Sequence, residues 1–417
     1  MYYRYAHPEL FEGVPRPDFA GLSGRLAIYG AGLTGLLTAW LLEQQGIEAL
    51  CFLDRDPKKQ GRPFHGLPVL SPEEGKRRFP RAVPVVAVNS VFPVWRSLTR
   101  ELGYPTVLTP FSLLLEFDPN GFETLRELPA WFHMDSIDYH VDMFLLRCVN
   151  LLTPHRLLSV DVSVTERCNL RCRHCNALMP CYEAPRDSDP GELIHAFDTL
   201  LQGRVFDHIN IEGGEPFLWD PLPELLSYLN GRGEVMRIFV LTNGTILPAP
   251  DLSEALRLPK VAVRVSDYGD GAGLDVLRGW LQERQIAYRV YQQRWYELQA
   301  YHRAPLQGQT FRNVIDGCSR LEGSSARYLT DGRLFNCPEQ ANLHKLGVFR
   351  SEEDEYVDLR GENTAALQSR ISAFLDPERR SGIPRLCRHC GGRGFQGTEV
   401  PPAEQLAPGE TIMIKFE

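Results

Sequence analysis

The stretch LLSVDVSVTERCNLRCRHC, residues 157–175, joins a strand to a short loop that carries three cysteines. The first nine residues are typical of a strand, and Cys168, Cys172 and Cys175 follow it with the spacing C-x3-C-x2-C. Three thiolates on one loop can bind three irons of a [4Fe–4S] cluster and leave the fourth iron without a protein ligand. Such an open position is what a metal site needs to bind a substrate.

Two other interpretations of these cysteines stay open at this point. A structural zinc ion prefers four ligands in C-x2-C pairs, and here the fourth would be His174 or Cys181. Buried free thiols are the other alternative. Seven of the ten cysteines fall into two spaced sets, which favours metal or redox chemistry over disulfides in a chain without an export signal.

Further strands and helices alternate downstream of the cysteine loop. The segments FDHINIEGGEP, MRIFVLTNGT, VAVRVSDYG and IAYRVYQ predict strands, and PGELIHAFDTLLQ, LPELLSYLN and GLDVLRGWLQERQ predict helices between them. A series of five or so strand–helix units predicts a partial (β/α)6 barrel of the TIM type. Its chemistry is expected at the carboxyl ends of the strands.

The ends of these strands resemble the radical S-adenosylmethionine (SAM) superfamily. The cysteine spacing follows the first strand, and Gly213-Gly214-Glu215-Pro216 at the second is similar to that family's GGEP motif. In the family this motif receives the amino group of SAM, and glycine permits the close backbone approach. Asn243 and Ser266 match the strand ends that contact ribose and adenine. His174 stands where the family often has an aromatic residue, and it can still pack beside the adenine.

The resemblance implies a reductive mechanism. An electron from the reduced [4Fe–4S] cluster would cleave SAM into methionine and a 5′-deoxyadenosyl radical, which removes hydrogen from an unactivated carbon. The cofactor supplies the difficult chemistry while the protein orients it. The resemblance also implies an external electron donor of the flavodoxin or ferredoxin type.

A second set of cysteines lies near the C-terminus. Cys318 and Cys337 flank a predicted hairpin whose turn is Asp331-Gly332, and Cys387 and Cys390 form a later C-x2-C. The layout resembles the twitch domain, a shortened relative of the SPASM domain. This resemblance implies that the four cysteines hold an auxiliary [4Fe–4S] cluster that relays an electron, while a zinc site with four cysteine ligands stays open.

A glycine motif marks the N-terminal part of the chain. Gly30, Gly32 and Gly35 lie between a predicted strand and helix, and Asp54 ends the next strand. This is the dinucleotide fingerprint, in which bare backbone meets a pyrophosphate and the acid meets a ribose. The downstream HGLPVLSPEE resembles Rossmann domains that bind nucleotide-sugars. A nucleotide or nucleotide-sugar ligand is therefore expected, with an unliganded structural domain as the alternative.

The sequence thus predicts an α/β protein built from several domains. An N-terminal extension (1–23) precedes a Rossmann-like, doubly wound domain (24–112) and an aromatic-rich connector (113–156). The radical SAM partial barrel follows (157–305), and then a twitch-type hairpin-plus-helix domain with the C-terminal tail (306–417). The apolar run 26–42 is short and broken by glycines, so it predicts a strand, a turn and a helix instead of a membrane span.

The net charge and the N-terminal sequence limit the kinds of partner that we expect. The formal net charge is −8 without a long Lys/Arg block, which argues against a nucleic-acid partner. The sequence MYYRYAHPEL lacks the pattern of a secretory signal, so we expect a cytoplasmic protein with no membrane partner.

The expected function is oxidation or epimerisation of a small, carbohydrate-like substrate. The alternatives are a radical SAM enzyme acting on a peptide, a zinc- and NAD-dependent dehydrogenase, and a non-catalytic iron–sulfur scaffold. No acid or base can be assigned; Tyr268 and Glu297, with Trp295 and Tyr296 beside them, are candidates near strand ends or ordinary packing residues. Cys181 is either a substrate-facing thiol or a packed residue, and Cys51 and Cys148 are expected in cores.

Overall fold

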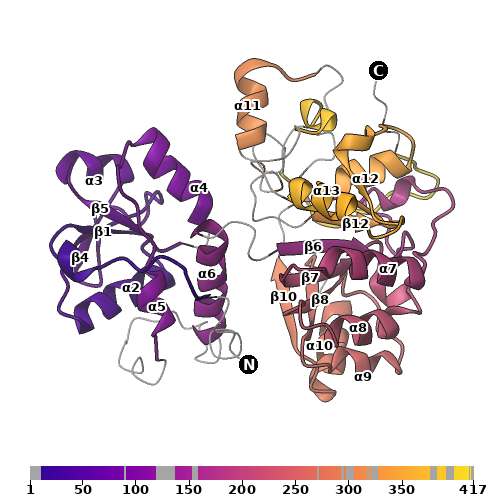
Figure 1. Cartoon of the computed structure of the whole chain (residues 1–417). Helices are drawn as coiled ribbons and strands as arrows, with labels where there is room; N and C mark the ends of the chain where they lie inside the picture. Colours follow the sequence, from indigo (N-terminus) through magenta and orange to yellow (C-terminus); the bar gives the residue numbers. More distant parts are fainter. Residues whose placement is uncertain are drawn as a thin grey trace. The chain divides into compact units, whose positions relative to one another are not determined.

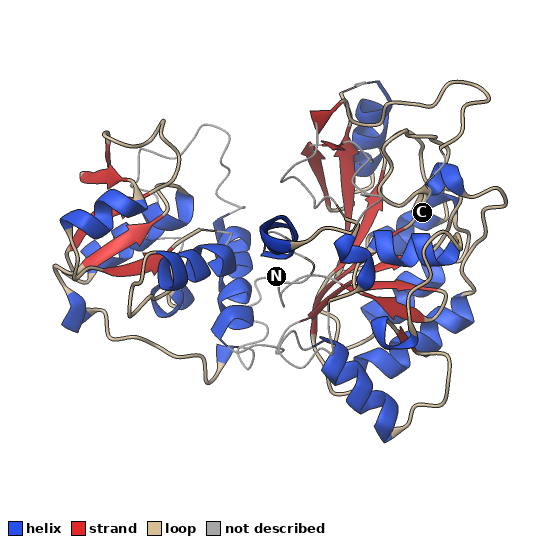
Figure 2. Ribbon diagram, turned by 90° about the horizontal axis from the view of Figure 1, so that it is seen from above, coloured by secondary structure: helices blue, strands red, loops and turns tan. Residues whose placement is uncertain are grey.

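The computed structural model divides the chain into two compact units, Met1–Arg156 and Leu157–Glu417. It describes residues 11–88, 91–118, 137–152, 158–269, 272–292, 295–296, 305–316, 318, 320, 327–375, 383–390, 399–412 and 414. Figure 1 labels the elements of each unit, and Figure 2 shows the strands of each unit flanked by helices. Within the described residues no helix has both the length and the apolar character needed to cross a membrane.

The first unit contains a mostly parallel sheet with the order β3-β4-β2-β1-β5. Its strands are β1 (Leu26–Tyr29), β2 (Ala49–Leu53), β3 (Pro63–Phe64), β4 (Leu67–Leu70) and β5 (Val83–Val86), and only β3 runs antiparallel to its neighbour. Helix α2 (Leu33–Gln44) follows β1, and α3 (Pro72–Arg78) follows β4. The strand–turn–helix expected over residues 26–42 is therefore confirmed.

The region expected to be a connector contains helices. Helix α5 (Phe111–Leu115) packs against α2, and α6 (Ile137–Leu152) packs against α5 and α4 (Val91–Arg96). Val141, Phe144, Leu145 and Cys148 of α6 are buried. These side chains recur on one face of the helix, so α6 is part of the core of the first unit.

The second unit is organised by an eight-stranded sheet with the order β10-β9-β8-β7-β6-β12-β13-β14. The first six strands in this order are parallel: β10 (Tyr288–Gln292), β9 (Val261–Asp267), β8 (Ile238–Thr242), β7 (Phe206–Glu212), β6 (Leu158–Ser163) and β12 (Arg327–Thr330). This agrees with the expected partial barrel of radical SAM type. The sixth parallel strand comes from the C-terminal hairpin, which adds β13 (Arg333–Phe335) and β14 (Val357–Asp358) antiparallel.

One face of this sheet packs against helices and the other is polar. Val160 and Val162 of β6 join a hydrophobic cluster with side chains of α7 (Pro190–Leu201), α8 (Leu222–Asn230), α9 (Leu252–Leu256), α10 (Ala272–Glu283) and α13 (Ala365–Leu375). Successive strand residues point to opposite faces, so Ser159, Asp161 and Ser163 lie on the other, inner face. In Figure 1 the helices α7 to α10 gather along one side of the strands.

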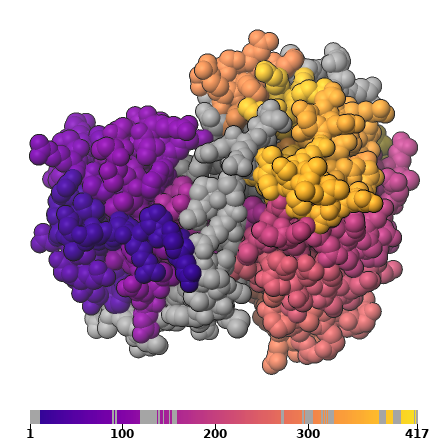
Figure 3. Space-filling view, in the orientation of Figure 1, coloured from indigo at the N-terminus to yellow at the C-terminus, as the bar shows by residue number. Residues whose placement is uncertain are grey.

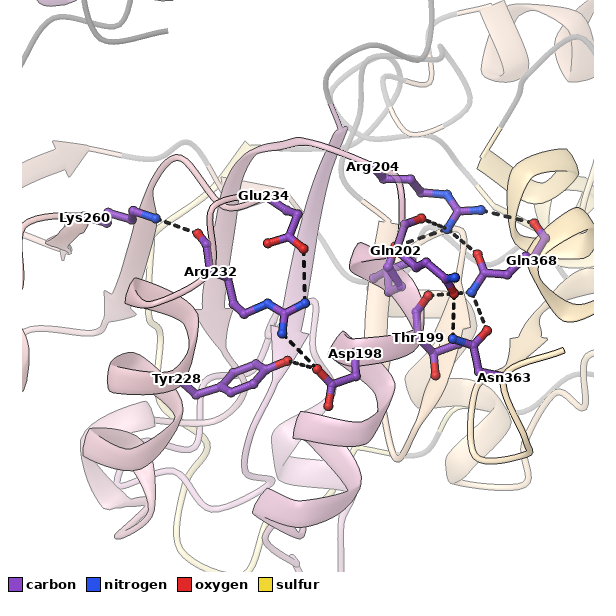
Figure 4. Close-up of polar contacts among 11 residues, drawn as sticks. Asp198, Thr199, Gln202, Arg204, Tyr228, Arg232, Glu234, Lys260, Asn363 and Gln368 are labelled. Carbon is purple, nitrogen blue, oxygen red and sulfur yellow. Dashed lines mark hydrogen bonds and ion pairs between the residues drawn. The ribbon is translucent and has the colours of Figure 1, made fainter. Parts of the chain in front are cut away.

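Helix α13 is fastened to the rest of the second unit by polar contacts. Arg204, in the loop before β7, donates to Gln368 Oε1 at 2.7 Å and to Ser372 Oγ at 2.8 Å, and Gln368 Nε2 donates to Thr199 O at 2.8 Å (Figure 4). Figure 3 shows the surface of the C-terminal segments continuous with that of the barrel residues. These contacts lie at the amino ends of the strands, where barrel residues serve stability.

The predicted hairpin turn is confirmed. Asp331 and Gly332 have positive φ values of 46° and 65° between the antiparallel strands β12 and β13. Two successive positive φ values match the twist of a two-residue hairpin. After the turn, Cys337 caps helix α12 (Pro338–Lys345).

Candidate active site at the carboxyl ends of the barrel strands

The GGEP turn after β7 packs directly on the backbone that leads into the cysteine loop, residues 168–175. Gly214 N–H donates to Thr165 O at 2.8 Å, and Glu215 N–H donates to Arg167 O at 2.8 Å. A Cβ at Gly214 would lie 2.0 Å from Arg167 O, and one at Gly213 would lie 2.4 Å from Thr165 O. The glycines therefore bring two strand ends together, whereas the sequence suggested only that they approach a ligand.

Glu215 joins the end of β7 to the end of β8. Its side chain has no exposed surface, and its two oxygens accept Asn243 N–H at 2.9 Å and Phe217 N–H at 3.2 Å. Burial raises the pKa of this carboxyl to about 7, although these hydrogen bonds oppose the shift. The carboxylate expected to meet SAM thus also holds the third strand end in place.

Asn243 connects that third strand end to the cysteine loop. Its Nδ2 donates to Asn169 Oδ1 at 2.8 Å and lies 3.9 Å from Cys168 Sγ, while its Oδ1 accepts Thr245 N–H at 2.9 Å. The side chain is buried and lies beside the first cysteine. Its predicted contact with SAM stays a prediction.

The three cysteines of the loop lie close enough to influence one another. Burial raises the pKa of the Cys168 and Cys175 thiols to about 11, and the charges of neighbouring cysteines add to the shift. The pKa of Cys172 is raised by burial and by Cys168. A bound cation has the opposite effect on the pKa of a thiol, because its positive charge stabilises the thiolate.

Hydrogen-bond donors also face these sulfurs. Leu170 N–H lies 3.4 Å from Cys168 Sγ, and Gln405 Nε2 lies 3.2 Å from Cys172 Sγ. Donors to sulfur are among the protein features that set the potential of an iron–sulfur cluster. Three half-buried or buried thiols on one loop, each with N–H donors beside it, fit a cluster that each thiolate binds through a different iron.

No group of three or more His, Cys, Asp or Glu side chains that could hold a metal ion was found in the part of the chain that the structure describes. Thiolates of a [4Fe–4S] cluster bind separate irons and do not converge on one point.

Of the other predicted residues, Tyr268 lies near the loop. Tyr268 follows β9, and burial raises its pKa above the usual range, with added contributions from Cys172, Cys175 and Glu215. Its ring meets Trp295 edge-on, with 5.5 Å between centroids. Ser266 is half-buried on the inner face of β9 beside it, and His174 is half-buried within the loop. Tyr296 forms β11 with Trp295, whereas Glu297 lies outside the described residues.

The second cysteine set lies in the C-terminal part of the chain, and its role as a cluster site stays a prediction. Cys337 Sγ accepts Gln340 N–H at 3.4 Å at the start of α12. Burial raises the pKa of Cys337, and Glu339, Cys387 and Cys390 raise it further, which places the last two cysteines near it. Cys318 follows α11 (Gly308–Asp316), and its membership of the set stays a prediction. Cys181 is half-buried, with Sγ 3.9 Å from Ile412 O, whereas Cys51 and Cys148 lie in the core as expected.

A polar array on the inner face of the barrel escaped the sequence reasoning. Asp161 accepts Asn210 Nδ2 at 2.7 Å and Arg320 Nη1 at 2.6 Å, and Arg264 Nη1 donates to Asn210 Oδ1 at 3.2 Å. The Arg264 guanidinium lies 3.5 Å from the centre of the Phe239 ring. The signal was available, because polar residues recur at every second position of LSVDVS, FDHINIE and VAVRVS.

The glycine motif of the first unit forms a tight strand–helix turn. A Cβ at Gly35 would lie 1.8 Å from Gly30 O, whereas one at Gly32 would meet no atom within 4 Å. Asp54 Oδ2 accepts Ala31 N–H at 2.9 Å and Lys59 Nζ at 3.0 Å. Burial would raise the pKa of Asp54, but its hydrogen bonds hold it below the usual value. The acid thus lies against the glycine turn, and its predicted contact with a ribose stays a prediction.

Comparison with known proteins identifies the central domain. Residues 162–271 match the Radical SAM superfamily, so the chain contains a radical SAM domain. This agrees with SAM and a [4Fe–4S] cluster as its cofactors.

Among curated proteins, one similar relative is an S-adenosylmethionine-dependent nucleotide dehydratase of Selenomonas ruminantium. It is 29% identical over 93 residues, which cover 22% of this chain and 32% of the relative. A GTP 3',8-cyclase of Pelotomaculum thermopropionicum is 34% identical over 93 residues, 21% of this chain and 27% of the relative. The matches therefore span about a third or less of the length of these relatives.

Two solved structures are also similar. BtrN in complex with AdoMet and 2-DOIA is 16% identical, covers 60% of this chain and 98% of its own, and has a TM-score of 0.34. The anSMEcpe structure with bound AdoMet is 12% identical, covers 57% of this chain and 92% of its own, and has a TM-score of 0.37.

Proposed function

We propose that this protein is a radical SAM enzyme that oxidises or epimerises a carbohydrate or nucleotide-sugar-like substrate in the cytoplasm. The observation that carries the proposal is the bracing of the cysteine loop by two neighbouring strand ends. Gly214 and Glu215 hold its entry, and Asn243 reaches Cys168 from β8. Such bracing keeps three thiols at the edge of the barrel where catalytic residues of this fold gather.

Cys168, Cys172 and Cys175 would hold the [4Fe–4S] cluster. When bound, it supplies the electron that splits SAM into methionine and a 5′-deoxyadenosyl radical, which takes a hydrogen atom from the substrate. Tyr268 lies near these thiols, and its half-buried ring packs edge-on against Trp295. This aromatic pair would exclude water from the carboxyl edge, where a radical must be shielded from solvent.

The inner face of the barrel supports a substrate rich in hydroxyl groups. Asp161, Asn210 and Arg264 offer donors and acceptors in one connected array, and their charges are largely compensated within it. The Arg264 guanidinium, which stacks on the buried Phe239 ring and is itself half-buried, adds a flat surface that suits a sugar ring or a base. A polar face of this kind binds neutral hydroxylated molecules through many directional hydrogen bonds.

We further propose an auxiliary [4Fe–4S] cluster on Cys318, Cys337, Cys387 and Cys390, and an external flavodoxin or ferredoxin as electron donor. The nearness of Cys337 to Cys387 and Cys390 supports the first of these. Four thiolates saturate such a cluster, so substrate would not bind its iron.

Anaerobic reconstitution followed by iron and sulfide counting tests the metal content. About eight irons per chain are expected for two clusters, about four for one, and a metal-poor protein contradicts the proposal. Cys172→Ala should then abolish reductant-dependent formation of 5′-deoxyadenosine. Cys181→Ala is the matched control, because this thiol lies beside the loop without being a proposed ligand, and it should retain iron and product.

Arg264→Met tests the substrate assignment. With a panel of nucleotide-sugars and aminocyclitols, the wild-type chain should form more 5′-deoxyadenosine with its substrate than without it. Arg264→Met should lose this stimulation and keep the basal cleavage of SAM. Arg232 pairs with Asp198 and Glu234 at the amino-end edge of the barrel (Figure 4). The control variant Arg232→Met should keep both the stimulation by substrate and the basal cleavage of SAM. Stimulation by a peptide alone would contradict the carbohydrate assignment.

We also propose that the first unit binds a nucleotide or nucleotide-sugar over its glycine turn. Gly32 is the N-cap residue of α2 and offers no side-chain cap, and a Cβ there would meet no protein atom within 4 Å. Gly32→Ala should therefore lower stability only by the weaker N-cap preference of alanine, about 0.5–1 kcal/mol, and obstruct a ligand at the bare helix terminus. Calorimetric titration with UDP-glucose and its relatives should show lost binding in Gly32→Ala and retained binding in Gly233→Ala, whose added Cβ also meets nothing. Equal affinity in the two variants would exclude this site.

A further inference from the structure

The C-terminal segment 403–410 lies along the cysteine loop as an added piece of backbone ladder. Arg173 N–H donates to Glu404 O at 2.7 Å, and Leu406 N–H donates to Arg171 O at 2.9 Å. These bonds connect residues more than two hundred positions apart in the chain. Leu406 is buried, with 8% of its surface exposed, so the segment is packed as well as hydrogen-bonded.

The side chain of Gln405 is held at both ends. Its Oε1 accepts Arg171 N–H at 2.7 Å, and its Nε2 donates to Cys172 Sγ at 3.2 Å and to Ala403 O at 2.6 Å. The orientation of the amide follows from these partners. A backbone N–H requires the oxygen on one side and a carbonyl requires the nitrogen on the other, so an N–H is directed at the sulfur.

Ion pairs fix the segment against the loop on either side of this amide. Arg173 Nε donates to Glu404 Oε1 at 2.9 Å, and Arg173 Nη2 donates to Glu410 Oε2 at 2.8 Å. Glu410 also accepts Ala407 N–H at 3.0 Å, which closes a turn within the segment. These partly exposed pairs contribute modestly to stability, but together they restrict where Gln405 can lie.

We infer that Gln405 is a positioning residue of the cluster site, whose N–H to Cys172 Sγ raises the reduction potential of the SAM-binding [4Fe–4S] cluster. The inference rests on the proposed function only in that Cys172 binds iron. Reduction adds negative charge to the cluster and its thiolates, so a hydrogen-bond donor at sulfur stabilises the reduced form more than the oxidised form. The C-terminal segment thereby becomes part of the radical site.

The test is a redox titration of the reconstituted, full-length protein, followed by electron paramagnetic resonance. The first cluster is recognised as the component whose spectrum changes when SAM is added. Gln405→Met has a similar length and no donor. We expect it to lower the equilibrium constant for reduction about tenfold, which is 59 mV for one electron. Gln405→Glu keeps the acceptor for Arg171 N–H and should lower the potential further than Gln405→Met, because it removes the donor and adds a negative charge.

Glu404→Gln is the matched control, because it weakens one ion pair of the same segment and leaves the Gln405 amide in place. Its potential should stay within a twofold change in that constant. The spectrum reports only loaded protein, so a partly loaded variant is still measurable, and Gln405→Leu, which is uncharged and also lacks the donor, decides the matter if Gln405→Met takes up no iron.

An unchanged potential in a loaded Gln405 variant would overturn the inference and leave the proposed function standing. Absence of any SAM-responsive cluster in the wild-type chain would instead contradict the proposed function itself.

Discussion

Replacing Gly214 by alanine tests how tightly the GGEP turn holds the cysteine loop. The added Cβ would lie 2.0 Å from Arg167 O, 2.5 Å from Arg167 C and 3.0 Å from Cys168 N. Ordinary contacts begin at about 3.4 Å, so backbone must move by about 1.4 Å. Because the obstacle is backbone and not the end of a flexible side chain, the strain cannot be relieved by a rotamer change.

The expected cost follows from what this movement breaks. The bonds from Gly214 N–H to Thr165 O and from Glu215 N–H to Arg167 O, both 2.8 Å, cannot both survive. Each bond contributes about 0.5–1.5 kcal/mol, at least one of them is lost, and overpacking costs about 1–3 kcal/mol more, so we expect a loss of about 1.5–6 kcal/mol in the free energy of unfolding. The displaced loop should also bind iron poorly.

The assay combines urea-induced unfolding with iron counting after anaerobic reconstitution. Hydrogen–deuterium exchange of peptides from residues 158–218 localises the change to the barrel. Gly279→Ala is the matched control, since a Cβ there meets nothing within 4 Å inside helix α10, and it should stabilise the protein by about 0.5–1 kcal/mol. A Gly214→Ala protein with wild-type stability and full iron content would refute the reasoning.

Three further predictions address charge and domain independence. Arg237→Met leaves Asp207 buried without its guanidinium partner and should lower the free energy of unfolding, measured with urea at pH 7, by about 3–5 kcal/mol. The difference in stability between wild type and variant should narrow below about pH 4. Arg237 and His208 outweigh burial and lower the pKa of Asp207 in the folded wild-type protein, so the wild type loses this stabilisation as the unfolded chain takes up a proton. Burial raises the pKa of Glu215 to about 7, so between about pH 4.5 and 7 the folded state holds a proton that the unfolded state has lost. The free energy of unfolding should therefore fall by about 3 kcal/mol as the pH rises from about 4.5 to above 7. An equally steep fall in Glu215→Gln would contradict this assignment. Gly35→Ala places a Cβ 1.8 Å from Gly30 O and should lower the thermal transition of the first unit while the iron content of the second is retained; loss of that iron would show that the units depend on each other.

Much of the fold could be predicted because its signals are local. Alternating strands and helices, the positive φ values of the Asp331-Gly332 turn and the cap of α3 by Ser71 depend on residues only a few positions apart. The three-cysteine loop is equally local, so its chemistry could be inferred before any tertiary contact was known. The N-terminal glycine turn could be predicted for the same reason, because its glycines lie within six consecutive residues.

Other features depended on contacts between distant segments. Helix α6 was not predicted, because its flanking sequence contains no clear helix-start signal. Its buried face is determined by tertiary packing. The engagement of Glu215 by Asn243 depends on the register of β7 and β8, and the pairing of Asp161 with Arg320 joins residues far apart in the chain. No short-range pattern encodes such partners.

The amino-acid sequence by itself thus determined the type of site, because the spacing of three thiols and two glycines is set within single loops. Only the tertiary structure decided what surrounds those thiols: a buried carboxylate, an asparagine from the next strand and an amide from the C-terminal segment. The physical reason is that covalent spacing controls which ligands one loop can present. The hydrogen bonds and burial that tune those ligands come from segments that meet only when the chain folds.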